Sequence, residues 1–121
     1  MEKHYNDNIL VVENCVVECL KLSSKEHDMN TCIQRCIIHE RICKALKVCM
    51  KYNCDKETYI CLMYSCLNSG LNVIEECLKH KMKHCQDCVK IVNKLVQVLN
   101  KKCQKQKCSC KKQLKLTKKK K

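Results

Sequence analysis

The chain has 121 residues, 45% of them hydrophobic, and a formal net charge of +13, which fits one domain with a hydrophobic core. It contains no Pro and a single Gly, so it lacks the residues that punctuate β-hairpins and tight turns, and a β-rich fold is excluded. The positive charge is concentrated at one end. Residues 101–121 hold 11 of the 25 basic residues and no acid, whereas residues 1–100 hold 14 basic and 12 acidic residues. The sequence therefore predicts a near-neutral body followed by a basic tail.

Fifteen cysteines and the absence of Phe and Trp set this chain apart from an ordinary helical domain. Free Cys packs as a small hydrophobe, but this number exceeds what packing explains. The apolar run near the N-terminus spans only residues 9–12, too short for a secretory leader, and no segment approaches the length of a membrane span. We therefore expect a cytoplasmic protein. In that compartment stable disulfides are disfavoured, and many thiols indicate metal binding or redox chemistry.

Helical periodicity predicts two helices in the first half of the chain, over residues 4–24 and 27–52. The inward stripe of the first contains Ile9, Val12, Cys15, Cys19 and Leu22. Residues 23–25 are expected to form a loop, and Asp28 or Asn30 can cap the second helix. The stripe of the second, at steps of four and three, contains Cys32, Cys36, His39, Cys43 and Leu46.

Two more helices are predicted over residues 56–80 and 82–106, with Asp55 as the N-cap of the first. The inward column of the third helix contains Leu62, Cys66, Ser69, Val73, Cys77 and His80. Gly70 lies inside this helix, but the stripe keeps its phase, so we expect a continuous helix. The column of the fourth contains Cys85, Cys88, Val92, Leu95, Leu99 and Cys103.

Four helices joined by short loops predict an all-α fold, an antiparallel up-down-up-down four-helix bundle over residues 1–106 with a cysteine-lined core. Residues 107–121, which include Cys108 and Cys110, are rich in Lys and are predicted to be a disordered tail. Cys49 and Cys61 are expected at the edge of the core. The connections that follow the first and third helices share one end of this bundle, which collects His27, Met29, His80, Met82 and His84.

Three interpretations of the inward thiols remain open from spacing alone. Cys15, Cys19, Cys32 and Cys36 could form two disulfides between neighbouring helices, but this leaves most cysteines unexplained. Cys85 and Cys88, with Cys77, His80 and His84 nearby, could form a discrete zinc or iron–sulfur site. Alternatively, several Cu(I) ions could bind, because Cu(I) accepts two or three soft thiolates and tolerates bridging sulfurs.

The paired cysteines along four helices, His39 within such a column, and the string ECLKHKMKHCQDC over residues 76–88 resemble the four-helix-bundle copper storage proteins. The resemblance covers residues 9–103. It implies storage or buffering of Cu(I), with His or Met residues near one end assisting entry. Ser69, Val73, Val92, Leu95 and Leu99 stand where that family usually has further thiols, which implies a lower capacity and a partly apolar core. The metal ligands implied are Cys15, Cys19, Cys32, Cys36, His39, Cys43, Cys49, Cys61, Cys66, Cys77, His80, His84, Cys85, Cys88 and Cys103.

No Ser/His/Asp arrangement, carboxylate pair or phosphate-binding loop is present in the sequence, so we do not expect an enzyme. Metal ions are the expected partners, with a copper chaperone and a second copy of the chain as further candidates. The Lys-rich tail can bind nucleic acid or another anionic surface without sequence specificity. The rival interpretation is a structural or interaction module, disulfide-linked or simply packed through its cysteines, that acts through this tail.

Overall fold

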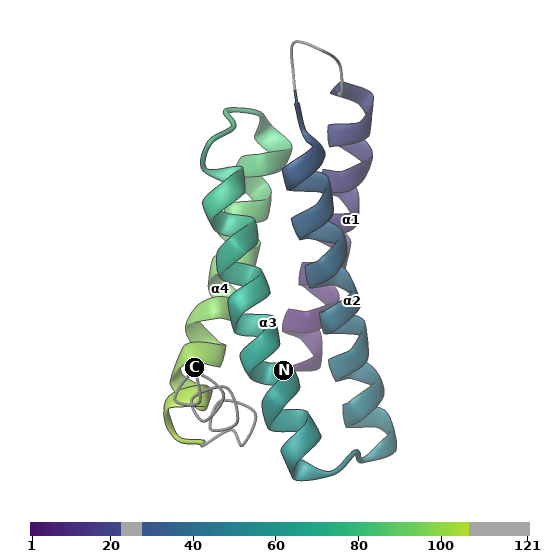
Figure 1. Cartoon of the computed structure of the whole chain (residues 1–121), viewed down its shortest axis with the longest axis vertical. Coiled ribbons are helices and arrows are strands. Elements are labelled where there is room, and N and C mark those ends of the chain that lie inside the picture. Colours follow the sequence, from purple (N-terminus) through teal and green to yellow (C-terminus); the bar gives the residue numbers. More distant parts are fainter. Residues whose placement is uncertain (23–27, 107–121) are drawn as a thin grey trace, which may run out of the picture.

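The computed structural model describes residues 1–22 and 28–106, which form four helices: α1 (Glu2–Leu22), α2 (Asn30–Tyr52), α3 (Lys56–Cys77) and α4 (Lys83–Gln104). Each helix packs against the next along the chain, and α1 also packs against α4 (Figure 1). This arrangement confirms the predicted all-α four-helix bundle. Residues 28–29 and 78–82 lie at one end, which we call the loop end, and residues 53–55 form the opposite turn end. The predicted loop at 23–25, His27 and the tail at 107–121 with Cys108 and Cys110 lie outside the described residues.

The start of α2 differs from the prediction, because the helix begins at Asn30 and its N-cap residue is Met29. Asp28 nevertheless contributes, since its carboxylate accepts a hydrogen bond from the Asn30 backbone N–H at 3.1 Å. The helix ends at Tyr52 because Asn53 adopts the left-handed conformation, with φ of 53°, that commonly terminates helices.

Asp55 is the N-cap of α3, as predicted. Its carboxylate accepts hydrogen bonds from the Thr58 hydroxyl at 2.7 Å and from the Thr58 backbone N–H at 3.2 Å. These bonds satisfy one of the backbone donors that every helix start leaves without a partner inside the helix.

The same two hydrogen bonds make the contribution of Asp55 depend on pH. Donation from Thr58 lowers the pKa of the Asp55 carboxyl below its ordinary value of 3.8. The stabilisation is therefore fully present above about pH 4 and is lost as the pH falls through the lower pKa of the folded state. We expect Asp55→Asn, which keeps a capping oxygen, to lower the urea midpoint slightly at pH 7 and to match wild type near pH 2. An equal difference at both pH values would contradict this account of the cap.

The end of α3 corrects the prediction of a helix to residue 80, because the helix stops at Cys77. The Lys79 N–H donates to Glu76 O and the His80 N–H donates to Cys77 O, both at 3.1 Å. These bonds span three residues instead of four, so the last turn tightens and the chain leaves the helix axis. His80 consequently does not continue the inward column of α3.

Gly70 lies inside an uninterrupted α3, as predicted, at a close contact with α4. A Cβ built on Gly70 would come within 2.8 Å of Val96 Cγ2 and within 3.4 Å of His39 Cε1 and Val92 Cγ1. Real Cβ atoms do not approach other heavy atoms to 2.8 Å, so any larger residue requires the neighbouring side chains to move.

We expect Gly70→Ala to lower the free energy of unfolding by about 1 kcal/mol. Overpacking of a core costs about 1–3 kcal/mol, and the better helix propensity of Ala returns about 1 kcal/mol. Urea denaturation measures the difference. The double variant Gly70→Ala with Val96→Ala should remove the clash, so its stability should exceed the sum of the two single effects. A Gly70→Ala protein more stable than wild type would show that Val96 yields without strain.

The core divides into two clusters of buried side chains along the bundle. The cluster at the loop end includes seven cysteines together with Val12, Met29, Val73 and Val92. The cluster towards the turn end includes Tyr5, Leu46, Leu95 and Leu99 with three further cysteines. Val73, Val92, Leu95 and Leu99 are fully buried, so part of the interior is apolar, as the sequence predicts.

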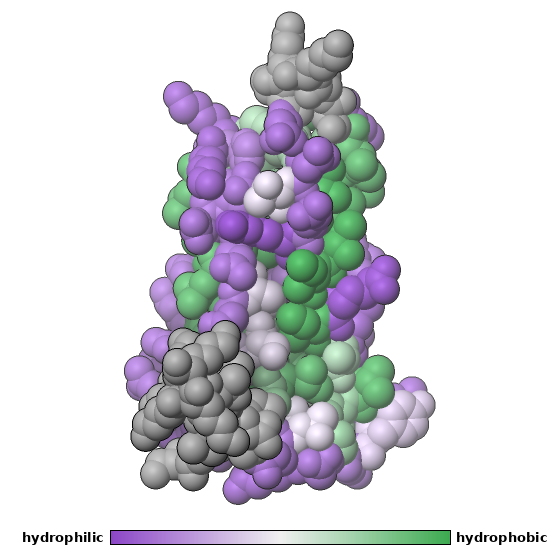
Figure 2. Space-filling view, viewed as in Figure 1, coloured by the Kyte–Doolittle hydropathy of each residue, from purple (hydrophilic) through white to green (hydrophobic). Residues whose placement is uncertain are grey.

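Hydrophilic residues cover much of the molecular face seen in Figure 2, with a band of hydrophobic residues on its right side. The exposed hydrophobic residues of α1 and α2 include Leu10, Val17, Leu20, Ile38 and Val48. Across residues 1–22 and 28–106, no helix combines the length and the apolar character needed to cross a membrane.

Candidate metal centres

The ten cysteines predicted to face the bundle axis are all buried, with no more than 4% of any of them exposed. They are Cys15, Cys19, Cys32, Cys36, Cys43, Cys66, Cys77, Cys85, Cys88 and Cys103. Each lies on the inward stripe of its helix because the spacing of three and four residues keeps one face towards the neighbouring helices. The sulfur atoms are not spread evenly along the axis, however, and gather in two places.

Seven of these thiols form what we call the loop-end thiol cluster, and every helix contributes to it. The members are Cys15 and Cys19 of α1, Cys32 and Cys36 of α2, Cys77 of α3, and Cys85 and Cys88 of α4. Paired residues four apart on α1 and α2 present two sulfurs from successive turns of one helix. The antiparallel neighbour then presents its own pair at the same height in the bundle.

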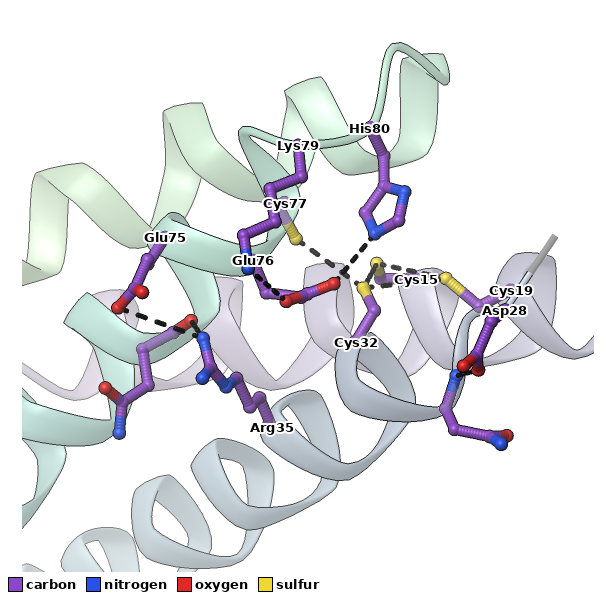
Figure 3. A network of polar contacts seen from close by, with 12 residues as sticks. Cys15, Cys19, Asp28, Cys32, Arg35, Glu75, Glu76, Cys77, Lys79 and His80 are labelled. Atoms are coloured by element: carbon purple, nitrogen blue, oxygen red, sulfur yellow. Dashed lines mark hydrogen bonds and ion pairs between the residues drawn. The ribbon is translucent and has the colours of Figure 1, made fainter.

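Three sulfurs in this cluster form a nearly equilateral triangle (Figure 3). Their separations are 3.9 Å for Cys15–Cys19, 3.8 Å for Cys15–Cys32 and 3.7 Å for Cys19–Cys32. The centre of such a triangle lies about 2.2 Å from each sulfur, close to the metal–thiolate bond length of about 2.3 Å known for zinc. Three thiolates can therefore surround one ion in a plane without moving their helices.

The triangle extends into two larger groups that share a member. Cys15, Cys32, Cys36 and Cys77 place their sulfurs within 4.8 Å of one another, and so do the ligand atoms of Cys15, Cys19, His84 and Cys85. His84 Nε2 lies 3.5 Å from the Cys19 sulfur, and the Cys77 sulfur lies 3.8 Å from that of Cys32. Because Cys15 belongs to both groups, its sulfur can bridge two ions.

Hydrogen bonds among the thiols distribute negative charge unevenly in the loop-end thiol cluster. The contact with Cys32, followed by that with Cys36, lowers the pKa of Cys15 to about 3, and the contact with Cys15 first of all lowers the pKa of Cys77 to about 4. The same contacts raise the pKa of Cys36 and Cys88, which act as donors. The thiolate is the metal-binding form of Cys, so Cys15 and Cys77 are the sulfurs best prepared to receive a cation.

A second group lies further along the bundle, where His39 and Cys43 of α2 meet Cys66 of α3. The Cys43 sulfur is 3.7 Å from that of Cys66 and 3.6 Å from His39 Nε2. The contact with Cys66 lowers the pKa of Cys43 to about 6, helped by His39 and opposed by burial. The same contact raises the pKa of Cys66.

Cys49, one of the predicted ligands, forms a disulfide with Cys54 in this structure. The left-handed turn at Asn53 folds the chain back, so the two Cα atoms lie 4.8 Å apart and the Cys54 N–H donates to Cys49 O. A disulfide sulfur is not a thiolate, so Cys49 supplies no ligand in this state. The sequence disfavoured stable disulfides, and the turn between Cys49 and Cys54 is an exception to that expectation.

His80 is not part of either group. It lies beyond the end of α3, where its Nε2 is 3.0 Å from Glu76 Oε2 (Figure 3). Glu76 itself is buried, since only 6% of it is exposed. Its carboxylate also pairs with Lys79 at 3.4 Å, and despite burial the contacts with His80 and Lys79 lower its pKa.

The remaining predicted ligands stand apart from the groups. Cys61 is half-buried, and Cys103 is buried near Cys66, whose pKa it helps to raise. Sequence reasoning missed Asn8, a buried side chain that lies 3.0 Å from His39 Nε2. Asn8 lies four residues before Val12 in α1, so helical periodicity could have predicted its burial. Nothing in the sequence indicates that its side chain contacts His39.

Comparison with known proteins found no match for this chain among protein-family models, curated proteins or solved structures. The residues themselves show closely packed Cys and His groups that could bind metal ions.

Proposed function

We propose that this protein binds, stores or buffers Cu(I) on the loop-end thiol cluster. The observation that carries the proposal is the triangle formed by the sulfurs of Cys15, Cys19 and Cys32, which lie 3.7–3.9 Å apart. Cu(I) is a soft ion that accepts two or three thiolates, so a planar set of three sulfurs is one of its ordinary environments.

The number of thiols supports storage of several ions. One mononuclear site needs at most four ligands, whereas seven buried sulfurs and His84 lie together in this cluster. With bridging thiolates, about half to one Cu(I) per sulfur corresponds to about four to seven ions. Each ion would also offset the cost of burying thiolate charge in an apolar core.

A single zinc ion is the second candidate, because the group of Cys15, Cys32, Cys36 and Cys77 offers four sulfurs from three helices. Four thiolates in a tetrahedron are a common structural zinc site. This alternative predicts one tightly bound divalent ion and leaves Cys19, Cys85 and Cys88 without a role in binding.

A competition titration separates the two. Cu(I) is added to the fully reduced protein in the presence of a chromogenic Cu(I) chelator, and Zn(II) is titrated in parallel against its own chelator. Our proposal predicts at least four tightly bound Cu(I) equivalents, of which most disappear in the double variant Cys32→Ser with Cys36→Ser. One equivalent or none, or Zn(II) held in preference to Cu(I), would overturn it.

A further inference from the structure

The His39–Cys43–Cys66 group is separated from the loop-end thiol cluster by packing and by distance. Cys43 and Cys66 belong to the other buried cluster of the core, and Val12, Val73 and Val92 belong to the cluster at the loop end. On α2 the nearest thiol of the loop-end thiol cluster is Cys36, seven residues or about 10 Å along the helix from Cys43. Among the described residues, no set of ligand atoms lying within 4.8 Å of one another combines members of both groups, so we infer that the two groups bind ions independently.

The three ligand atoms lie within 4.8 Å of one another, and the two separations from the Cys43 sulfur match those of a tetrahedral site. With Zn–S and Zn–N bonds of about 2.3 and 2.05 Å, a tetrahedral ion holds two sulfurs about 3.8 Å apart and a sulfur and a nitrogen about 3.6 Å apart. The observed separations are 3.7 Å for Cys43–Cys66 and 3.6 Å for Cys43 to His39 Nε2. Two thiols and an imidazole form a harder donor set than seven thiols and suit a borderline divalent ion.

The hydrogen-bond partners of His39 can orient its ring for a metal ion at Nε2. The Asn8 side-chain amide donates to His4 O at 2.8 Å, so its oxygen faces Nε2 at 3.0 Å as an acceptor. Ser69 Oγ lies 2.7 Å from Nδ1 and donates its own hydrogen to Cys66 O at 3.1 Å. Nε2 therefore faces an acceptor, whereas the Ser69 hydroxyl can either accept from Nδ1 or donate to it, so the tautomer of the ring decides the direction of that bond.

A bound metal ion would select one tautomer of His39. When an ion is bound at Nε2, the ring hydrogen resides on Nδ1 and donates to Ser69, which keeps its bond to Cys66 O. Metal-binding histidines are commonly oriented in this way by a hydrogen bond from the other ring nitrogen. The Asn8 oxygen then faces the ion and can occupy its fourth position. His39 and Asn8 are both at least 99% buried, so water is excluded from this site.

The Tyr5 hydroxyl is a further donor available to this site. It is fully buried. Burial above all, with smaller contributions from Tyr59, Cys66 and Cys43, raises its pKa, so it remains a protonated donor. When metal binding converts Cys43 and Cys66 to thiolates, Tyr5 gains nearby negatively charged sulfur to stabilise.

The geometry points to a second, independent metal site in which His39 Nε2, Cys43 and Cys66 bind one Zn(II) ion, with Ser69 positioning the imidazole. This inference goes beyond the proposed storage of Cu(I) and does not rest on it. One end of the bundle would hold many soft ions, and the middle would hold a single divalent ion that links α2 to α3.

The test is a Zn(II) titration of the metal-free, thiol-reduced full-length protein, in which long-range proton–nitrogen NMR spectra of the imidazole rings are recorded. Three variants are compared with wild type: Cys43→Ser at the site, Ser69→Ala beside it, and Cys36→Ser in the loop-end thiol cluster as the matched control. Circular dichroism and Cu(I) uptake are measured for each.

We expect Zn(II) at saturation to shift the His39 Nε2 resonance in wild type and in Cys36→Ser, and to leave it unshifted in Cys43→Ser. Ser69→Ala should weaken this Zn(II) binding about 10–100-fold, the usual effect of losing the group that orients a ligand, and should leave Cu(I) capacity unchanged. A His39 resonance that stays in place at Zn(II) saturation would overturn the assignment, and so would loss of the shift in Cys36→Ser. If Cys43→Ser does not fold, Ser69→Ala decides. Cu(I) uptake reports separately on the loop-end thiol cluster, so failure of either proposal is distinguishable from failure of the other.

Discussion

Loading the reduced protein with Cu(I) is expected to raise its melting temperature by about 15–30 °C. Ligands that bind only the folded state at about a thousand times their dissociation constant add about 4 kcal/mol. In a domain of this size each kcal/mol raises the midpoint by about 4–8 °C. We expect a large effect because the sulfurs of the loop-end thiol cluster come from all four helices. Ions bound there therefore link the helices that pack against one another.

Differential scanning calorimetry under anaerobic conditions measures this shift. The control is Cys61→Ser, which removes a half-buried thiol outside both candidate sites and should retain the full shift. A midpoint that Cu(I) leaves unchanged would show either that the ions bind outside the core or that unfolded chains bind them equally well.

Replacing Cys15 with Ser is expected to remove more than half of the Cu(I) capacity. Cys15 belongs to both four-residue groups of the loop-end thiol cluster, and it is the sulfur whose pKa the neighbouring thiols lower to about 3. A hydroxyl is nearly the same shape as a thiol but does not bind soft metal ions, so both groups lose a ligand at once. Without the Cys15 sulfur, ions in the two groups would no longer be bridged.

Native mass spectrometry of the titrated protein counts the bound ions directly. Cys85→Ser is the matched comparison, since Cys85 is equally buried but belongs to only one of the two groups. We expect Cys85→Ser to lose one or two ions, clearly fewer than Cys15→Ser. Equal losses in the two variants would mean that Cys15 does not bridge.

Sequence periodicity predicted the parts of this structure that depend on one helix at a time. Steps of three and four residues along Cys32, Cys36, His39 and Cys43 place all four side chains on one face, and all four are buried. The Asp55 cap was predictable for the same reason, because it depends only on a carboxylate and an N–H three residues further along.

Features that depend on the exact path of the chain or on two helices together were not predictable. The disulfide between Cys49 and Cys54 forms across the left-handed turn at Asn53, and Glu76 is paired with His80 and Lys79, which lie beyond the end of α3. Neither is marked by Gly or Pro. The gathering of thiols at one end likewise depends on which turns of α1 and α2 lie at the same height, which periodicity within a helix does not specify.

The most direct test of the central claim is X-ray absorption spectroscopy at the copper edge, on protein loaded with four equivalents of Cu(I). Our account predicts three-coordinate copper surrounded by sulfur, together with a copper–copper scattering distance short enough to require shared thiolates. Copper bound mainly by nitrogen or oxygen, or sulfur-bound copper without any copper neighbour, would contradict a multinuclear store on the loop-end thiol cluster.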